Sequence, residues 1–404
     1  MLISLAWKNV WRNKKRSLII LTAIAFGLWG GLMSGSIMMG MGESMVETAI
    51  NRDLAHIQIH DKNFVKENKI SNFIPNGFEV IENARSIEGV KAVSGRTIIE
   101  GMAASPTSSY GVKIVGIEPQ QARQVTDISK KIIAGSYFES KRKNQIIIGK
   151  KLAKRLNLKL RSKMVLSLQD LDGSIIYTAC RVVGIFKTES SLFDDMNVFV
   201  RQKDLFKELN IDPIVHEIAI RLKSAQILQV TDEIIKAKFN HCIVRTWKEL
   251  APEVAFLSIM MQQFTYLFVA IILFALLFGI TNTMLMSVMD RVRELGVLIA
   301  VGMKKRKVFT MILLETIFLS ITGGFGGILI GGLTIAYFSS AGIDLSAFAT
   351  SLENFGSSSI LYPFLPFVMY IILTIMIVVA ANIAAIYPAL KAIRLQPSEA
   401  IRTY

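Results

Sequence analysis

Charged side chains avoid four long apolar segments of this chain, with a single exception. The segments cover residues 18–41, 264–289, 308–338 and 362–386. Each is long enough for a helix to cross a bilayer, which takes roughly 20 apolar residues. Only Glu315, in the third segment, is charged. Because a carboxylate at that depth is costly unless it faces protein or water, Glu315 is a candidate functional residue. The alternative is that it snorkels toward the basic residues at 304–307.

Residue patterns for enzyme chemistry are absent from the sequence. There is no G-x-x-x-x-G-K-[ST] loop for nucleotide phosphates, no H-E-x-x-H or C-x-x-C motif and no G-x-S-x-G turn. We therefore predict that the chain is not an enzyme and holds neither a metal nor a cofactor. His56 and His60 have metal-like i,i+4 spacing, but Ile57 and Ile59 alternate with them and favour a strand. We expect His56, Gln58 and His60 on its solvent-side face.

Two cysteines, Cys180 and Cys242, lie in the long polar part of the chain. A disulfide can persist there if that part lies outside the cytoplasm. Their strand-like surroundings favour two unpaired core thiols over a bridge.

The short connections between the apolar segments differ in their Lys and Arg content. The N-terminal tail, the loop at 290–307 and the C-terminal tail are basic, whereas the loop at 339–361 has neither residue. Basic residues of short loops stay on the cytoplasmic side. We therefore predict cytoplasmic termini and an external position for residues 43–258. This is the topology of a multi-pass membrane protein with a large external domain.

The predicted fold class is a multi-pass α-helical membrane protein with four transmembrane helices, arranged 1+3, and a large α+β extracytoplasmic domain between helices 1 and 2. The predicted spans are 18–42, 259–289 (with an external stalk), 308–338 and 362–387. The other parts are an amphipathic helix at 1–17, the domain at 43–258, a helical loop at 290–307, an external loop at 339–361 and a tail at 388–404. The stalk is expected because the uncharged run from 254 to 289 measures about 54 Å as one helix, beyond a hydrocarbon core of roughly 30 Å.

The first residues predict an interfacial helix and not a signal peptide. The apolar run behind them has about 24 residues, more than the 7–15 of a signal peptide. One helical face is apolar and comprises Ile3, Ala6, Trp7, Val10 and Trp11. We expect this helix to lie in the inner interface with both tryptophans as anchors.

The external domain is predicted to mix strands and helices. Period-two runs indicate strands at 56–60, 112–115 and 145–148, and helical periods indicate helices at 77–87, 150–158 and 231–239. The turn at 170–173 predicts a hairpin. The length allows two lobes, one formed by the flanks and one by about 120–215.

The formal net charge of +15 does not indicate nucleic acid binding. Lys and Arg outside the external domain lie in the tails and in the 290–307 loop, where topology explains them. The domain itself is mildly basic and has no basic run of the kind that follows phosphates. Anionic membrane lipid is the better partner for this surface.

The most specific pattern follows the second span. Asp290 takes the chain out of the membrane, and a short amphipathic segment then leads to Gly302, which is placed as a helix C-terminal stop. Taken alone, this segment could equally be a simple turn between two spans.

The same segment resembles the coupling region of the four-span ABC transporter permeases that include the macrolide-exporter, lipoprotein-releasing and cell-division permeases. The matching residues are Asn282, Thr283, Met284, Ser287, Val288, Arg291, Arg293, Glu294, Gly296, Leu298, Ala300 and Gly302. The third span and the tail match through Glu315, Leu319, Gly323, Gly324, Gly327, Gly331, Pro388, Ala389, Ala392, Pro397, Glu399, Ala400 and Arg402.

The resemblance implies a bacterial inner (cytoplasmic) membrane protein with a large periplasmic domain, which works by mechanotransmission. A separate pair of ABC ATPase subunits, which bind ATP and Mg, would dock on the helix at 290–303 and on the tails, and two permease subunits, copies or paralogues, would form one transporter. The implied coupling residues are Arg291, Arg293, Glu294, Leu295, Gly296, Leu298, Ala300 and Gly302. Asn282 and Glu315 are the polar residues expected within the membrane.

Glycines at helical spacing predict close packing of two spans. They are Gly323, Gly324, Gly327 and Gly331 on the third span and Gly27, Gly31 and Gly35 on the first. Small residues at this spacing let helix backbones approach one another.

Within the family, segments of the external domain look like the lipoprotein-releasing group. This likeness implies that the chain extracts lipoproteins from the inner membrane for outer-membrane sorting, with a periplasmic carrier as a further partner. Lipid would then reach the protein laterally along a wall formed by Met33, Ile37, Met38, Met41, Phe264, Leu267 and Phe268. Plain lipid-facing packing is the alternative for these side chains. For the protein, the alternatives are macrolide-exporter-like efflux of drugs, peptides or toxins from the periplasm, or a non-transporting scaffold or regulator.

Overall fold

The computed structural model describes residues 2–12, 14–139, 143–348, 351–352 and 356–394, which form two compact units. The helical unit comprises Met1–Glu43, Ser258–Asp344 and Ile360–Tyr404, and the sheet unit comprises Ser44–Leu257 and Leu345–Ser359. Residues 395–404, with the predicted tail matches Pro397, Glu399, Ala400 and Arg402, lie outside the described part.

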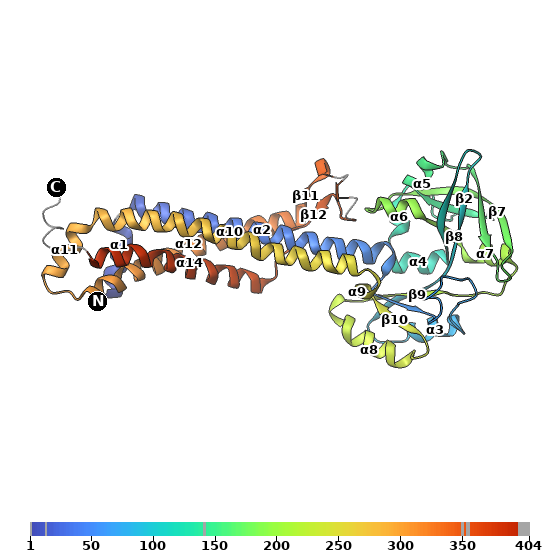
Figure 1. The fold of residues 1–404 in the computed structure, drawn as a ribbon, viewed down its shortest axis with the longest axis horizontal. Helices are drawn as coiled ribbons and strands as arrows, with labels where there is room; N and C mark the ends of the chain where they lie inside the picture. Colours follow the sequence, from blue (N-terminus) through green and yellow to red (C-terminus); the bar gives the residue numbers. More distant parts are fainter. Residues whose placement is uncertain (1, 13, 140–142, 349–350, 353–355, 395–404) are drawn as a thin grey trace. The chain divides into compact units, whose positions relative to one another are not determined.

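Long apolar helices build the helical unit, in which they run alongside one another (Figure 1). They are α2 (Lys14–Ala49), α10 (Pro252–Asp290), α12 (Lys305–Ala341) and α14 (Phe367–Arg394). In the part of the chain that the structure describes, four helices are long and apolar enough to cross a membrane, which confirms the predicted number of membrane helices. The unit also contains α1 (Leu2–Arg12), α11 (Val292–Ala300) and a small ladder of β11 (Ile343–Asp344) with β12 (Ile360–Leu361).

The core of the helical unit forms where the glycines of α12 meet α2. A Cβ added at Gly327 would lie 2.8 Å from the Cβ of Leu28, and one added at Gly323 would lie 3.0 Å from the Cβ of Ile24. Ile24 and Leu28 are fully buried. The glycines therefore act as predicted here, since a side chain in their place would push the two helices apart.

The sheet unit is built on ten strands. Together with the two strands of the helical unit, they make up all the strands of the described chain. They are β1 (Ile57–His60), β2 (Val90–Ala104), β3 (Ser109–Ile117), β4 (Ile132–Gly135), β5 (Gln145–Gly149), β6 (Lys163–Gln169), β7 (Ile175–Phe186), β8 (Asn197–Arg201), β9 (Glu217–Leu222) and β10 (Ile243–Thr246). The helices are α3 (Gly77–Arg85), α4 (Pro119–Val125), α5 (Lys150–Arg155), α6 (Ser191–Met196), α7 (Gln202–Leu209), α8 (Leu228–Lys238) and α9 (Trp247–Leu250), with a π-helical turn at Ile50–Leu54. Together the two units confirm the predicted fold class of four membrane helices with an α+β domain between the first two.

Strand pairing joins two parts of the sheet through β2. The strands run in the order β10-β1-β9-β2-β3-β8-β5-β7-β4, and β6 pairs with both β7 and β2, so that β2, β3, β8, β5, β7 and β6 close a ring. The antiparallel pair β6–β7 confirms the predicted hairpin. Separate apolar cores fill the ring and the open part of the sheet. The ring includes β2 and β3, which precede the lobe predicted at about 120–215, and β2 runs through both parts of the sheet.

The prediction of a solvent-side face on β1 is wrong. His56, Gln58 and His60 are 6%, 4% and 6% exposed. The reason is that β1 is an inner strand, paired with β10 on one side and with β9 on the other, and both of its faces are covered. The cysteines agree with the prediction, since Cys180 and Cys242 are buried free thiols.

Candidate functional site

The α10–α11 connection turns sharply, and its sequence explains how. Arg291 leaves the helical conformation between α10 and α11, with φ −110° and ψ 13°. At the other end of α11, Gly302 has φ +103°, a conformation that side-chain-bearing residues rarely adopt. The backbone N–H of Gly302 donates to the carbonyl of Ile299 at 3.0 Å and that of Met303 to the carbonyl of Leu298 at 3.0 Å, which closes the helix end. Gly302 therefore stands at the end of α11, as the sequence predicted.

The turn places Arg291 against the carboxylate within the apolar segment. Arg291 Nη1 lies 3.2 Å from Glu315 Oε1, and the two side chains are 11% and 7% exposed. Arg291 Nη2 also donates to the backbone carbonyl of Asn9, in α1, at 3.1 Å. A buried charge without a partner is strongly destabilising, so the pair holds both residues in place. One guanidinium thus connects α1, the start of α11 and α12.

α1 reinforces this junction from two sides. Arg12 forms an ion pair with Glu294 of α11, with both side chains about half exposed. Trp7 packs edge-on against Phe318 of α12, with ring centroids 5.3 Å apart. An exposed ion pair contributes little to stability, so Arg12 and Glu294 define orientation more than they hold the fold. Sequence reasoning placed α1 at the membrane surface but missed its contacts with α11 and α12.

An open groove of about 1,090 Å³ lies between α1 and α11. Its walls combine apolar side chains with four cationic ones and one acid, namely Leu5, Trp7, Lys8, Asn9, Trp11, Arg12, Arg291, Arg293, Glu294, Leu295, Val297, Leu298 and Met311. Such a groove suits an amphipathic helix that carries acidic residues. The groove brings together five of the predicted coupling residues, Arg291, Arg293, Glu294, Leu295 and Leu298. Gly296 is buried beside them, whereas Ala300 and Gly302 are exposed outside the groove.

The remaining predicted site residues lie elsewhere in the helical unit. Asn282 is exposed on α10, away from the groove. A Cβ at Gly331 would meet Leu32 at 2.7 Å, and Gly324 faces Thr374 of α14 at an ordinary 3.7 Å. On α2, Gly27 packs against Leu276 and Gly35 against Thr265, both of α10. Gly31 corrects the prediction, because a Cβ there would have no other heavy atom of the described chain within 4 Å.

The predicted lipid wall divides between two helices that lie side by side, as the contacts of Gly27 and Gly35 show. The members from α2 are half-buried and those from α10 are exposed. They are Met33, Ile37, Met38 and Met41 on α2 and Phe264, Leu267 and Phe268 on α10. The exposure of Leu267, 53%, leaves this surface available to lipid or to another protein.

Two family descriptions match the chain. The FtsX-like permease C-terminal family matches residues 266–397, and the MacB-like periplasmic core domain matches residues 17–237, which is more than half of the chain. An uncharacterized ABC transporter permease of Methanocaldococcus jannaschii is 24% identical over 343 residues, 82% of each chain. The lipoprotein-releasing system transmembrane protein LolC of Buchnera aphidicola is 24% identical over 339 residues, 81% of each chain. The macrolide export ATP-binding/permease protein MacB of Brucella abortus is 26% identical over 168 residues, 38% of this chain and 25% of that protein.

Candidate membrane-crossing helices with an α+β domain inserted between the first two are the architecture of a transporter permease. The matched families identify the kind of permease. This chain belongs to the family of ABC transporter permeases with a MacB-like periplasmic core domain and an FtsX-like C-terminal part. Members of the family are multi-pass membrane subunits that work with ABC ATPase partners, in which the ATPase activity lies.

Proposed function

We propose that this chain transmits movement from a separate pair of ABC ATPase subunits, which bind ATP and Mg, and that it thereby extracts lipoproteins from the inner membrane. In this proposal both termini and α11 are cytoplasmic, and the sheet unit is periplasmic. Two permease subunits, either copies or paralogues, form one transporter.

The observation that carries the coupling role is the junction beside the groove. A partner helix seated between α1 and α11 would contact Glu294 and Leu298 directly. Movement of α11 would be passed on through Arg291, because this residue is bonded to Glu315 of α12 and to Asn9 of α1. α10 is one helix from Pro252 to Asp290, so it offers a continuous path along the chain. Rigid helices that share a buried ion pair are suited to such transmission.

Lipoprotein release is supported by the likeness to LolC along most of the chain and by the exposed apolar surface of α10. An acyl chain needs an apolar path that adapts to its shape, and the methionines of α2 beside Phe264 and Leu267 provide flexible apolar surface. The shorter likeness to MacB supports the alternative, efflux of drugs, peptides or toxins.

The coupling role is tested by changing the groove while leaving the buried junction intact. Glu294→Lys reverses a half-exposed charge, and Leu298→Lys places a charge on an apolar wall of the groove. We expect both variants to insert normally and to lose transport and stimulation of the partner ATPase. Glu233→Lys, on an exposed position of α8, is the matched control and should behave as the unaltered protein does. Normal transport by both groove variants, with the ATPase still bound, would refute the coupling role.

The proposed topology is tested by reporter fusions. Fusions at Asp127 and Leu345 should report an external position, and fusions at Lys305 and Tyr404 a cytoplasmic one. A cytoplasmic reading at Asp127 would refute the arrangement.

The substrate is tested at the proposed lipid wall. Ile37→Asp and Leu267→Asp should leave lipoproteins in the inner membrane, because a carboxylate repels acyl chains. Leu333→Asp, on the exposed surface of α12, has the same cost of insertion and should not affect release. If depletion of the protein leaves lipoprotein sorting unchanged and raises sensitivity to amphipathic drugs or peptides, the exporter function replaces the proposed one.

A further inference from the structure

The sheet unit contains a cavity of about 280 Å³ above one face of β1, β9, β2, β3 and β8. Side chains of alternate residues in a strand share a face, and the register aligns His60 with Glu217, Glu217 with Arg96 and Arg96 with Ile117. These four residues therefore form a row across the strands beneath the cavity. Ligand pockets start at roughly 300 Å³, so this cavity is the size of a small-molecule site.

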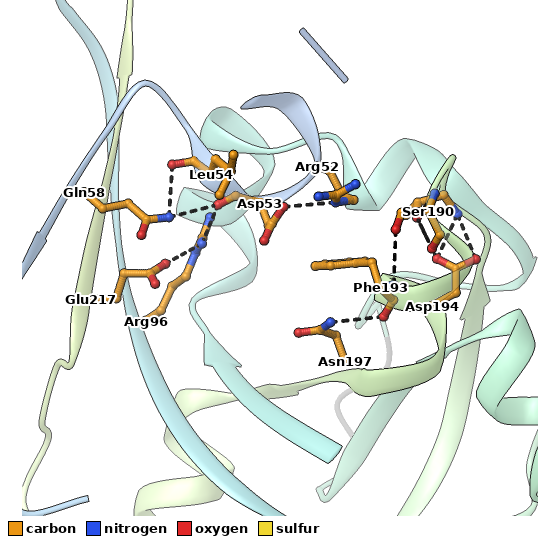
Figure 2. A network of polar contacts seen from close by, with 11 residues as sticks. Arg52, Asp53, Leu54, Gln58, Arg96, Ser190, Phe193, Asp194, Asn197 and Glu217 are labelled. Atoms are coloured by element: carbon orange, nitrogen blue, oxygen red, sulfur yellow. Dashed lines mark hydrogen bonds and ion pairs between the residues drawn. The ribbon is translucent and has the colours of Figure 1, made fainter. Parts of the chain in front are cut away.

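The row contains charges that the protein itself neutralises. Arg96 Nη1 donates to a carboxylate oxygen of Glu217 and, at 2.7 Å, to the backbone carbonyl of Asp53 (Figure 2). His60 Nε2 lies 3.3 Å from the other carboxylate oxygen of Glu217. Burial alone would raise the pKa of Glu217, but the charge of Arg96 and the hydrogen bond from His60 lower it below its usual range. Glu217 is therefore ionised, and it accepts a hydrogen from Nε2 of His60.

The second ring nitrogen of His60 has nothing to bond. Nδ1 belongs to a side chain that is only 8% exposed, and it is buried without a hydrogen-bond partner in the described chain. With Nε2 donating to Glu217, Nδ1 is an acceptor whenever the ring is neutral. A buried acceptor without a partner costs free energy, and His60 lines the cavity. The cavity thus presents an acceptor for a donor group of a ligand.

The unmatched charge in the cavity is positive. Asp53 is paired with Arg52 and Glu217 with Arg96, whereas Glu100 accepts only from the neutral amide of Asn68. The lining also contains Lys113 and Arg245, so its four cations exceed its three acids by one positive charge. Lys113 lies opposite Glu100 in the β2–β3 ladder and its charge also acts on Glu217, but it forms no hydrogen bond or ion pair with a described residue. Lys113 precedes Val115 and Ile117 on the same face of β3, so its ammonium group stands at the border of an apolar surface. An anionic group would complete this site.

The rest of the lining is apolar and aromatic. It includes Phe64, Val115, Ile117, Tyr137, Phe193 and Phe199. The guanidinium of Arg52 lies 5.0 Å from the ring centroid of Phe193 and holds that ring in place (Figure 2). A ligand with a polar head and an apolar body would therefore be matched at both ends.

We propose that this cavity binds a small organic acid with an aromatic or other apolar body and a hydroxyl or amine donor near its carboxylate. The carboxylate pairs with Lys113, the donor bonds to Nδ1 of His60, and the body packs against Phe64, Val115 and Phe199. The acyl chains of a lipoprotein are much larger than this cavity, so the site is distinct from the proposed transport path and does not depend on it.

The proposal is tested with phenyllactate on the full-length protein in lipid discs, with empty discs as background, by calorimetry or ligand-detected NMR. Phenyllactate should bind. Phenylpropionate, without the hydroxyl group, and 3-phenyl-1,2-propanediol, without the carboxylate, should each bind about tenfold more weakly, as expected for the loss of one hydrogen bond to a buried or charged group.

Variants assign each part of the ligand. Lys113→Gln should bind phenyllactate and the diol equally well. His60→Gln should bind phenyllactate and phenylpropionate equally well. Val115→Phe should abolish binding by filling the cavity. The matched controls are Lys163→Gln and Val165→Phe on β6, outside the cavity lining, and both should bind as the unaltered protein does. Thermal unfolding verifies that each variant is folded. The proposal would be overturned if phenyllactate did not bind at about 10 mM. It would also be overturned if Val115→Phe left the binding unchanged.

Discussion

Both units contain a buried pair of arginine and carboxylate, and the two pairs serve different ends. Arg291 and Glu315 join helices, with side-chain exposures of 11% and 7%. Arg96 and Glu217 join neighbouring strands, with exposures of 9% and 5%. The first arginine is bonded to elements that lie next to an open groove, whereas the second pair lies beneath a smaller cavity. The same chemistry therefore joins helices in one unit and lines a cavity in the other.

Histidine separates the two units further. All four histidines of the chain, at positions 56, 60, 216 and 241, belong to the sheet unit. Since histidine is the side chain that ordinarily titrates near neutral pH, the histidine response to mild acid is confined to the sheet unit. This difference can be measured.

The largest effect is expected from breaking the helical pair. Glu315→Leu leaves the Arg291 guanidinium buried without its carboxylate, and removal of one partner of a buried pair costs about 3 to 5 kcal/mol. Unfolding of the protein in detergent mixtures should show this loss. The double variant Arg291→Met with Glu315→Leu should recover most of the stability but not the coupling to the ATPase. A single variant as stable as the unaltered protein would show that the pair does not hold the junction.

The next effect is a loss of stability of the sheet unit on acidification. Burial, with a smaller contribution from Arg221, lowers the pKa of His56 from 6.5 to about 4. The unfolded chain therefore takes up a proton below pH 6.5 that folded His56 does not. The stability that neutral His56 contributes is complete above pH 6.5 and is lost as the pH falls toward 4, by about 2 kcal/mol down to pH 5.

Hydrogen exchange of β1 and β9 in the full-length protein at pH 7 and pH 5, corrected for intrinsic rates, measures this loss. His56→Gln should flatten the dependence, whereas His241→Gln, at an exposed position, should not. Helix amides of α12 should show no such change. An equal change in hydrogen exchange between pH 7 and pH 5 in both units would contradict this prediction.

The smallest effect concerns Gly327 and Gly31, for which the sequence predicts the same role in helix packing. A Cβ at Gly327 would lie 2.8 Å from Leu28 and 2.9 Å from the carbonyl of Ala25, so Gly327→Ala should destabilise the helical unit by about 1 to 3 kcal/mol. Gly31→Ala meets open space and should stabilise α2 by up to about 1 kcal/mol, the intrinsic helix preference of alanine. Unfolding midpoints of both variants provide the measurement, and a similar loss at both positions would contradict the packing described.

Local pattern was sufficient to predict the architecture. Uninterrupted apolar runs specify the four spans, because the length of a membrane helix is fixed by the bilayer. The hairpin of β6 and β7 is likewise local, since a short turn joins its strands. In both cases the residues that determine the structure are neighbours in sequence.

The sites depend on contacts between distant residues, and these were missed. Glu315 and Arg291 were each singled out, but nothing in either segment indicates that the turn before α11 brings them together, or that Asn9 joins them. The sequence of β1 predicts a half-exposed strand, because the sequence of one strand shows only how its apolar and polar residues alternate. Its burial follows from pairing with β9 and β10, which come more than 150 residues later.

The pairing of β1 with β10 has a further consequence. β1 follows α2 and the π-helical turn, and β10 leads into α9 and α10, with Ile57 opposite Thr246. The segment between α2 and α10 therefore begins and ends its sheet with adjacent residues of one ladder, about 5 Å apart. A segment with neighbouring ends can be inserted into, or removed from, a host chain without stretching it. The part of the sheet unit between α2 and α10 could thus be exchanged while the ends of both helices keep their spacing.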